Sequence, residues 1–306
     1  MTTNDRIAKE FWDREVVEQT HVSWMGDPVV RAYINESISG SPGMWPLDWF
    51  QAFLGGRTFA RGLSIGCGSG GLERDLLARG ICAEMDAFDG SAESIRMATE
   101  EAARAGLSGR LHYSVGDFNE PRLPRAAYDI VFVHQAMHHV AKLEKLYRAI
   151  LRTLKPEGLL YLDEYIGPSR HEWTDENFAL QRSIYDALPP SARTIDLLPM
   201  PIQTHDPSEA IRSGEIVREL QVGFEVLARR DYGGNVLATV YAYTDGSVTR
   251  ELLDRERALL REGAESYHAV IVARPRRAAA KLIARGRYFV VPKVRRVLRA
   301  LHRSAR

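Results

Sequence analysis

Apolar and polar positions alternate in a regular order from about residue 61 onward. Short apolar runs, four to seven residues long, predict buried β-strands at 62–65, 83–88, 111–115, 130–133 and 159–165. Between them, apolar residues recur every three or four positions and predict helices at 72–78, 92–105 and 143–154. Strands that alternate with helices are typical of a doubly wound α/β sheet, with mostly parallel strands and right-handed crossovers.

The flanking segments follow other patterns. Residues 1–60 predict a helical cap with helices at 7–19, 28–38 and 47–54, and they contain four of the five tryptophans, Trp12, Trp24, Trp45 and Trp49. This cap either only packs on the sheet or also closes over a ligand, since aromatic rings can hold a cation. Residues 167–213 are rich in proline and predict an insertion on the substrate side, with one helix at 175–188. Further elements are expected as strands at 224–231 and 267–273 and a helix at 249–262. We therefore expect a cap, one α/β domain over 61–274 and a tail over 275–306.

Charge is distributed unevenly between these parts. The chain has 306 residues and a net charge of +1, yet twelve Lys or Arg and no acid lie between Arg274 and Arg306. Residues 1–273 therefore carry a net charge of −11. The tail is a basic amphipathic segment that either contacts an anionic surface or packs on the acidic body. Only two aromatic residues accompany its charges, so sequence-specific nucleic-acid binding is not expected.

Cysteine use and hydropathy indicate a cellular compartment. The two cysteines, Cys67 and Cys82, cannot build a disulfide framework, which favours a reducing environment. The N-terminal segment is too polar for a signal peptide, and no run approaches 18 apolar residues. We expect a cytoplasmic protein, with the tail as a means of peripheral contact with the inner face of a membrane.

A glycine cluster follows the first predicted strand and precedes a helix. Glycine lets the backbone turn sharply and approach a ligand closely, and a helix N-terminus offers unpaired N–H groups. Gly66-x-Gly68-x-Gly70 has the methyltransferase spacing, whereas Gly66-x-Gly68-x-x-Gly71 has the dinucleotide spacing. The loop, which includes Cys67 and Ser69, predicts an adenosine-bearing cofactor without choosing between the two.

Residues at the ends of the later strands help to distinguish the two kinds of cofactor. Asp89, within Asp89-Gly90-Ser91, lies at the end of the second strand, where a carboxylate can accept both ribose hydroxyls of either cofactor. Asp117-Phe118 ends the third strand and offers an acid for the adenine amino group and a ring for the base. The turn Leu154-Lys155-Pro156-Glu157-Gly158 precedes the fifth strand.

Together these motifs resemble those of the class I S-adenosylmethionine-dependent methyltransferases, over roughly residues 60–165 and the last two strands. The resemblance implies a Rossmann-like sheet of seven strands with an antiparallel last strand, and S-adenosylmethionine as cofactor. Glu157 departs from the usual Pro-Gly-Gly turn. The segments 163–170 and 206–213 are also similar to a group of bacterial methyltransferase-domain proteins whose substrate is poorly defined.

Polar residues after the fourth strand are candidates for the chemistry. His134 and Gln135 are expected beside the cofactor, and His138 and His139 are expected as catalytic, because imidazole titrates near neutrality. One of the two should approach the methyl group, and His138 is the slightly preferred base; both being structural is the alternative. Ubiquinone-type and small-RNA O-methyltransferases carry a Glu-x-x-Glu/His-His metal motif here. Because Gln135 replaces the acid, we expect no metal site.

The acceptor is expected next to the fifth strand and the insertion. We predict that it is bound by Glu164, Tyr165, Arg170 and Trp173. The predicted function is methylation of a small-molecule, sugar or lipid-linked acceptor, with oxygen as the favoured acceptor atom. The alternatives are an NAD(P)-dependent oxidoreductase and a non-catalytic S-adenosylmethionine-binding regulator.

Overall fold

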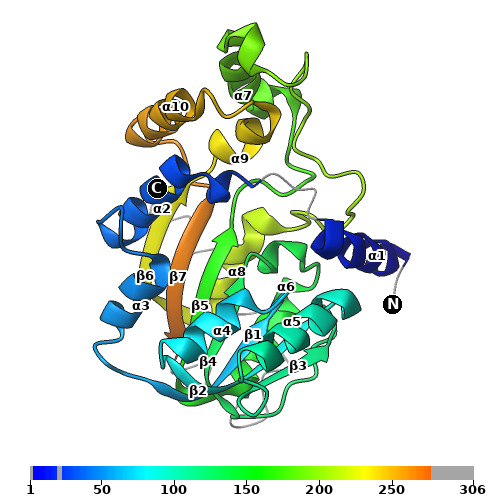
Figure 1. The fold of residues 1–306 in the computed structure, drawn as a ribbon, viewed down its shortest axis with the longest axis vertical. Coiled ribbons are helices and arrows are strands. Elements are labelled where there is room, and N and C mark those ends of the chain that lie inside the picture. The colour runs from blue at the N-terminus through cyan, green and yellow to red at the C-terminus, as the bar shows by residue number, and fades with distance from the viewer. Residues whose placement is uncertain (1–2, 19–22, 277–306) are drawn as a thin grey trace.

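A single seven-stranded sheet organises the molecule (Figure 1). The computed structural model describes residues 3–18 and 23–276. The strand order is β3-β2-β1-β4-β5-β7-β6, and the neighbouring strands among the first five are parallel. β7 runs antiparallel to both β5 and β6, so the predicted antiparallel last strand is confirmed. The strands are β1 (Phe59–Ile65), β2 (Cys82–Asp89), β3 (Leu111–Val115), β4 (Tyr128–His134), β5 (Leu154–Tyr165), β6 (Phe224–Gly233) and β7 (His268–Pro275).

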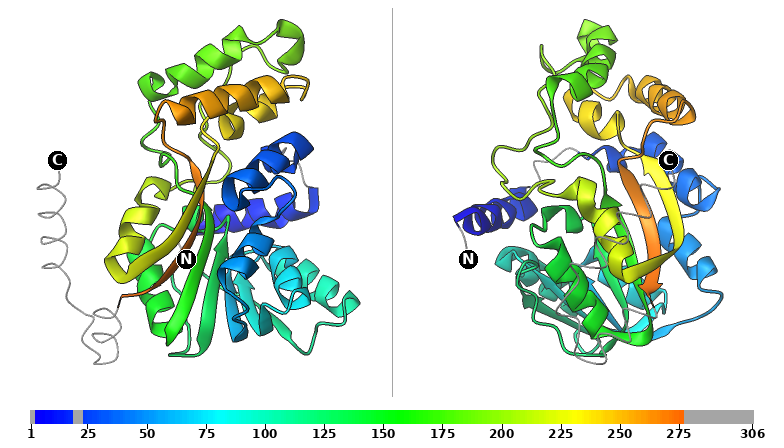
Figure 2. Two further views of the ribbon diagram at one scale, coloured as in Figure 1. Left: turned by 90° about the vertical axis from the view of Figure 1, so that its left-hand side faces the viewer. Right: turned by 180° about the vertical axis from the view of Figure 1, so that it is seen from behind.

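Helices cover both faces of this sheet (Figure 2, left). On β4, Ile130 and Phe132 contribute to one hydrophobic layer, and Val131 and Val133 contribute to the other. Burial on both faces explains why these strands appear in the sequence as continuous apolar runs. The first layer includes side chains of α2 (Pro28–Ser39), α3 (Pro46–Phe53), α4 (Gly71–Ala78) and α5 (Ala92–Arg104). The second includes side chains of α6 (Leu143–Thr153) and α8 (Ile216–Gly223).

The remaining helices lie beyond the carboxyl ends of the parallel strands or beside them (Figure 1). α1 (Thr3–Glu18) contacts α5, where the Asp13 carboxylate accepts hydrogen bonds from Ser91 Oγ and from the backbone N–H of Glu93. At the top of Figure 1 lie α7 (Asp175–Ala187), α9 (Leu237–Val240) and α10 (Thr249–Arg261). The 3-10 helices are η1 (Trp24–Gly26), η2 (Met137–His139), η3 (Pro190–Ala192), η4 (Ser213–Glu215) and η5 (Tyr241–Tyr243).

Several elements differ from the expectation, among them the short helix α9, which was not predicted. β5 begins at Leu154, so the predicted turn at 155–158 lies inside the strand, at a register shift against β4. α8 was not predicted, although Ile216 and Leu220 give it a short apolar face. None of the described helices is long and apolar enough to cross a membrane. The basic amphipathic tail expected over 275–306 lies, from residue 277 onward, outside the described residues.

Candidate active site

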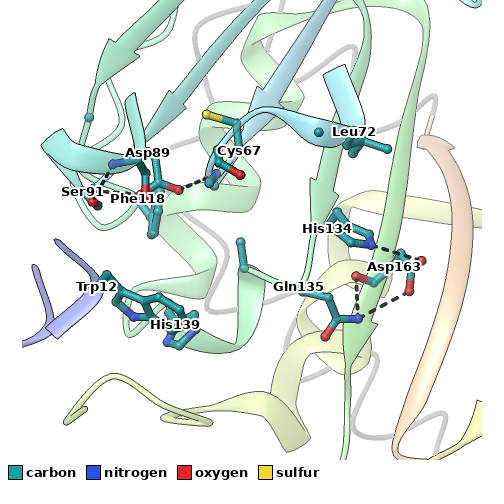
Figure 3. Close-up of a pocket in the computed structure, with 18 of the residues that line it drawn as sticks. Trp12, Cys67, Leu72, Asp89, Ser91, Phe118, His134, Gln135, His139 and Asp163 are labelled. Atoms are coloured by element: carbon teal, nitrogen blue, oxygen red, sulfur yellow. Dashed lines mark hydrogen bonds and ion pairs between the residues drawn. The ribbon is translucent and has the colours of Figure 1, made fainter. Parts of the chain in front are cut away.

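A cavity of about 660 Å³ lies at the carboxyl ends of β1, β2 and β4 (Figure 3). Parallel α/β sheets bind their ligands at this edge. Of the residues predicted to bind the cofactor, all but Gly70 line it: Gly66, Cys67, Gly68, Ser69, Asp89, Gly90, Ser91, Asp117, Phe118, His134 and Gln135. The structure therefore brings together segments that are up to 70 residues apart in the sequence.

The glycine loop adopts the backbone conformation that the methyltransferase spacing requires. Gly66, Gly68 and Gly70 all have positive φ, of 73°, 51° and 77°, whereas Gly71 begins α4 and has no such constraint. A Cβ on Gly66 would lie 2.2 Å from the Cβ of Ala136, and one on Gly70 would lie 2.1 Å from Tyr113 Oη. The conformation thus depends on the three glycines of the methyltransferase spacing, because other residues are strained at positive φ.

Asp89 fixes the loop against the end of β2. Its carboxylate accepts hydrogen bonds from the backbone N–H groups of Gly68, at 3.0 Å, and Ser91, at 2.8 Å. Phe118 lies on the same side of the cavity and its ring centroid is 5.9 Å from that of Phe88. A carboxylate and an aromatic ring therefore line the end of the cavity where the ribose and the adenine are expected.

Two buried acidic residues also line the cavity, although the predicted site did not include them. Glu73, on the first turn of α4, has no exposed surface, and burial raises the pKa of its carboxyl. Burial also raises the pKa of Asp163, which accepts a hydrogen bond from Tyr232 Oη at 2.6 Å and lies 3.6 Å from His134 Nε2. The available signal for Glu73 was an acid on the first turn of the helix that follows the glycine cluster.

His138 and His139 form η2 directly after β4. The structure reverses their expected orientation: His139 lines the cavity, and His138 is buried behind it. Burial lowers the pKa of His138, but the carboxylates of Glu164 and Glu209 outweigh this effect and raise it to about 9. Burial and the neighbouring His138 lower the pKa of His139.

Carboxylates surround this pair of imidazoles. His138 Nδ1 pairs with Glu164 Oε1, and the other Glu164 oxygen accepts the backbone N–H groups of Ala136 and Met137. His139 Nδ1 lies 3.0 Å from Ser208 Oγ and 3.4 Å from Asp206 Oδ2. Both Nε2 atoms lie 3.7 Å from Glu209 Oε2. The insertion thus supplies acidic groups to the end of β4.

The four residues predicted to bind the acceptor do not line the cavity. Glu164 is buried beneath η2, and Tyr165 donates its hydroxyl hydrogen to Pro168 O. The guanidinium of Arg170 donates to the backbone oxygens of Asp206 and Gln203, and Trp173 is buried against aromatic rings. Other side chains of the insertion, those of Pro207, Ser208 and Ile211, line the cavity instead. The lining residues that the predicted site did not include are, among others, Trp12, Arg31, Trp45, Pro207, Ser208 and Ile211.

Comparison with known proteins identifies the central segment. Residues 63–162, about a third of the chain, match the family model described as "Methyltransferase domain". A sterol 24-C-methyltransferase of Neurospora crassa is 34% identical over 118 residues, which are 39% of this chain and 31% of that protein. One of Aspergillus fumigatus is 34% identical over 104 residues, 34% of this chain and 27% of that protein. The chain thus spans about a third of the length of these curated relatives.

Solved structures share the fold across most of the chain. The geranyl diphosphate C-methyltransferase of Streptomyces coelicolor superposes with a TM-score of 0.55 at 14% identity, and covers 89% of this chain and 97% of its own. The [4+2]-cyclase SpnF gives a TM-score of 0.51 at 17% identity with the same coverage. Since one of the two is a cyclase, the fold by itself does not determine the reaction.

Proposed function

We propose that this chain, which carries a class I S-adenosylmethionine-dependent methyltransferase domain, transfers the cofactor's methyl group to a hydroxyl of a small-molecule, sugar or lipid-linked acceptor. The observation that supports the proposal most is the continuity of the cavity. The glycine loop, Asp89 and Phe118 line the same cavity as Trp12, His139 and Ser208. Its volume of about 660 Å³ lies in the range of small-molecule sites.

Most of the rate acceleration would come from alignment. In-line displacement at the sulfonium carbon needs the acceptor atom held opposite the sulfur, and such positioning gives effective molarities on the order of 10⁵–10⁸ M. A hydroxyl must also lose its proton, which a well-placed base accelerates by roughly 10²–10⁴-fold. Among the described residues, we assign the removal of this proton to the cluster of His138, His139 and Glu209.

Methylation at carbon is the second candidate. The curated relatives are named sterol 24-C-methyltransferases, and methyl transfer to an alkene produces a carbocation. Trp12 and Trp45 line the cavity, and aromatic faces stabilise cations by about 0.5–2 kcal/mol. The product separates the two candidates, because an ether and a new carbon–carbon bond give different fragments in mass spectrometry.

The proposal is tested in two steps. S-adenosylmethionine and S-adenosylhomocysteine should each raise the melting temperature, since a ligand stabilises the state that it binds, whereas NADP should not. Protein incubated with methyl-deuterated cofactor and a panel of hydroxylated and unsaturated acceptors should then yield labelled ethers. Stabilisation by NADP alone would contradict the cofactor, and labelled carbon–carbon products would favour the second candidate.

A further inference from the structure

We propose that His138, His139 and Glu209 bind a divalent transition-metal ion at the wall of the cavity. Each of the three offers one ligand atom, and these atoms all lie within 4.8 Å of one another. The histidines follow β4, whereas Glu209 comes from the insertion after β5, so the fold assembles the cluster from segments that lie far apart in the sequence. His139 faces the cavity, which gives an ion a route to the acceptor.

The geometry suits one shared ion. The Nδ1 atoms of both histidines are engaged by Glu164, Ser208 and Asp206, so the Nε2 atoms are available as ligands. Each Nε2 lies 3.7 Å from Glu209 Oε2. Two ligand atoms that each lie about 2.0–2.2 Å from one ion are separated by up to about 4 Å. These two separations let Glu209 share an ion with each histidine, and all three ligand atoms lie within 4.8 Å of one another, so a small rearrangement would bring them onto one ion.

Outer contacts orient each ligand as metal sites require. Metal-binding histidines almost always place their second ring nitrogen against a carboxylate, a carbonyl or water. Buried Glu164 has this position for His138, and Asp206 has it for His139. Asp206 is itself held by Trp12, whose Nε1 donates to Oδ2 at 2.9 Å. The two outer carboxylates are 0% and 1% exposed, and that burial makes their positions fixed.

The donor set indicates which ions fit. Two imidazoles and one carboxylate suit Zn²⁺, Co²⁺, Mn²⁺ or Fe²⁺, whereas Mg²⁺ prefers oxygen ligands alone. The sequence predicted no metal because Gln135 stands where related motifs carry an acid. In the structure Gln135 points to Asp163 and Tyr232, and Glu209 supplies the anionic ligand instead.

A role in catalysis follows if the proposed O-methylation is correct. Three protein ligands leave open positions, and a hydroxyl bound at one of them loses its proton to solvent more readily. The resulting oxygen forms a bond to the methyl carbon while the carbon–sulfur bond breaks. The electron pair of that bond stays on sulfur, which leaves S-adenosylhomocysteine. The ion changes no oxidation state, so no further reactant is required.

Metal binding is measurable without an acceptor. Full-length protein without an affinity tag is treated with a chelator, dialysed, and titrated with Zn²⁺ by calorimetry and with Co²⁺ by visible absorption. We expect the wild type to bind one ion per chain. The His139→Gln, Glu209→Gln double variant should bind none. Asp206→Asn should weaken binding by roughly 10–100-fold, as outer-contact variants do. His112→Gln changes an exposed histidine on β3 and should bind as the wild type does.

A second measurement distinguishes a misfolded variant from a failure of the metal proposal or of the proposed function. The melting temperature of the double variant and its binding of S-adenosylhomocysteine report on the fold. If wild type binds no more Zn²⁺ or Co²⁺ than a double variant that still binds S-adenosylhomocysteine, the metal site is wrong and the cluster is an ion-pair network. If the ion binds but no acceptor is methylated, the metal site stands and the proposed function fails.

Discussion

At the scale of a single residue, the carboxylate of Asp89 has two roles. It holds the glycine loop through Gly68 and Ser91, and it faces the cavity where the cofactor's ribose is expected. Charge-assisted hydrogen bonds contribute about 1.5–3 kcal/mol each, so we expect Asp89→Ala to weaken S-adenosylhomocysteine binding by at least about tenfold in calorimetry. Asp89→Asn keeps one acceptor oxygen, so its affinity should lie between those of the wild type and of Asp89→Ala.

The control for this prediction lies on the same strand. Glu84 is an exposed acid of β2 that does not line the cavity, and Glu84→Gln should leave the affinity unchanged. Melting temperatures of all variants show whether the fold survives. A folded Asp89→Ala protein with wild-type affinity would remove Asp89 from the ribose site.

Glu256 shows how one side chain joins whole elements. From α10 it reaches the segment after β6, where its two oxygens accept the backbone N–H groups of four buried residues. A buried donor without an acceptor costs about 1–3 kcal/mol, so Glu256→Ala should lower the free energy of unfolding by at least about 3 kcal/mol in urea titrations. The four donors are Gly234, Asn235, Val236 and Leu237.

Its control is a neighbour on the same helix. Asp254 is exposed, and Asp254→Ala should change the free energy of unfolding by less than about 0.5 kcal/mol. If Glu256→Ala proves as mild as this control, the carboxylate does not organise the junction.

The elements were predictable where one local pattern determines them. β4 is an apolar run because both of its faces are buried, and α6 shows a helical period, so each is visible in its own residues. The cofactor loop was equally local, since its glycines meet a strand and a helix within ten residues. β5 was placed too late because its first residues pair with β4 across a register shift that no periodicity reveals.

The acceptor side was not predictable in the same way. Arg170 carries a charge that suggested substrate binding, but its partners are backbone oxygens of the insertion, which only the folded chain places beside it. Glu209 lies 70 residues beyond His139, and no spacing rule joins them. Trp12 reaches the same place from α1. Such contacts depend on tertiary packing of an irregular, proline-rich segment.

At the scale of the whole molecule, β7 ends at the edge of the sheet opposite the cavity. β7 is antiparallel to β5, so its last residue, Pro275, lies opposite Phe224 at the start of β6, away from the carboxyl ends of the parallel strands. Arg276 is still fixed, by hydrogen bonds to backbone oxygens of Gly223 and Gln221. A chain that ends at Arg276 therefore keeps every described contact of the cavity.

We propose that residues 277–306 tether the protein to anionic lipid at the inner face of the cytoplasmic membrane. They carry ten Lys or Arg and no acid, and a basic residue near such a surface contributes about 1 kcal/mol.

The full chain should sediment with anionic vesicles at low salt and dissociate at high salt, because salt screens these charges. The chain that ends at Arg276 should remain in solution, since residues 1–276 have a net charge of −9 and are repelled. Its affinity for S-adenosylhomocysteine should equal that of the full chain, because the tail begins at the far end of the sheet. Full-length protein that stays in solution with anionic vesicles at low salt would contradict the tether, and equal sedimentation with uncharged vesicles would show that charge is not the cause.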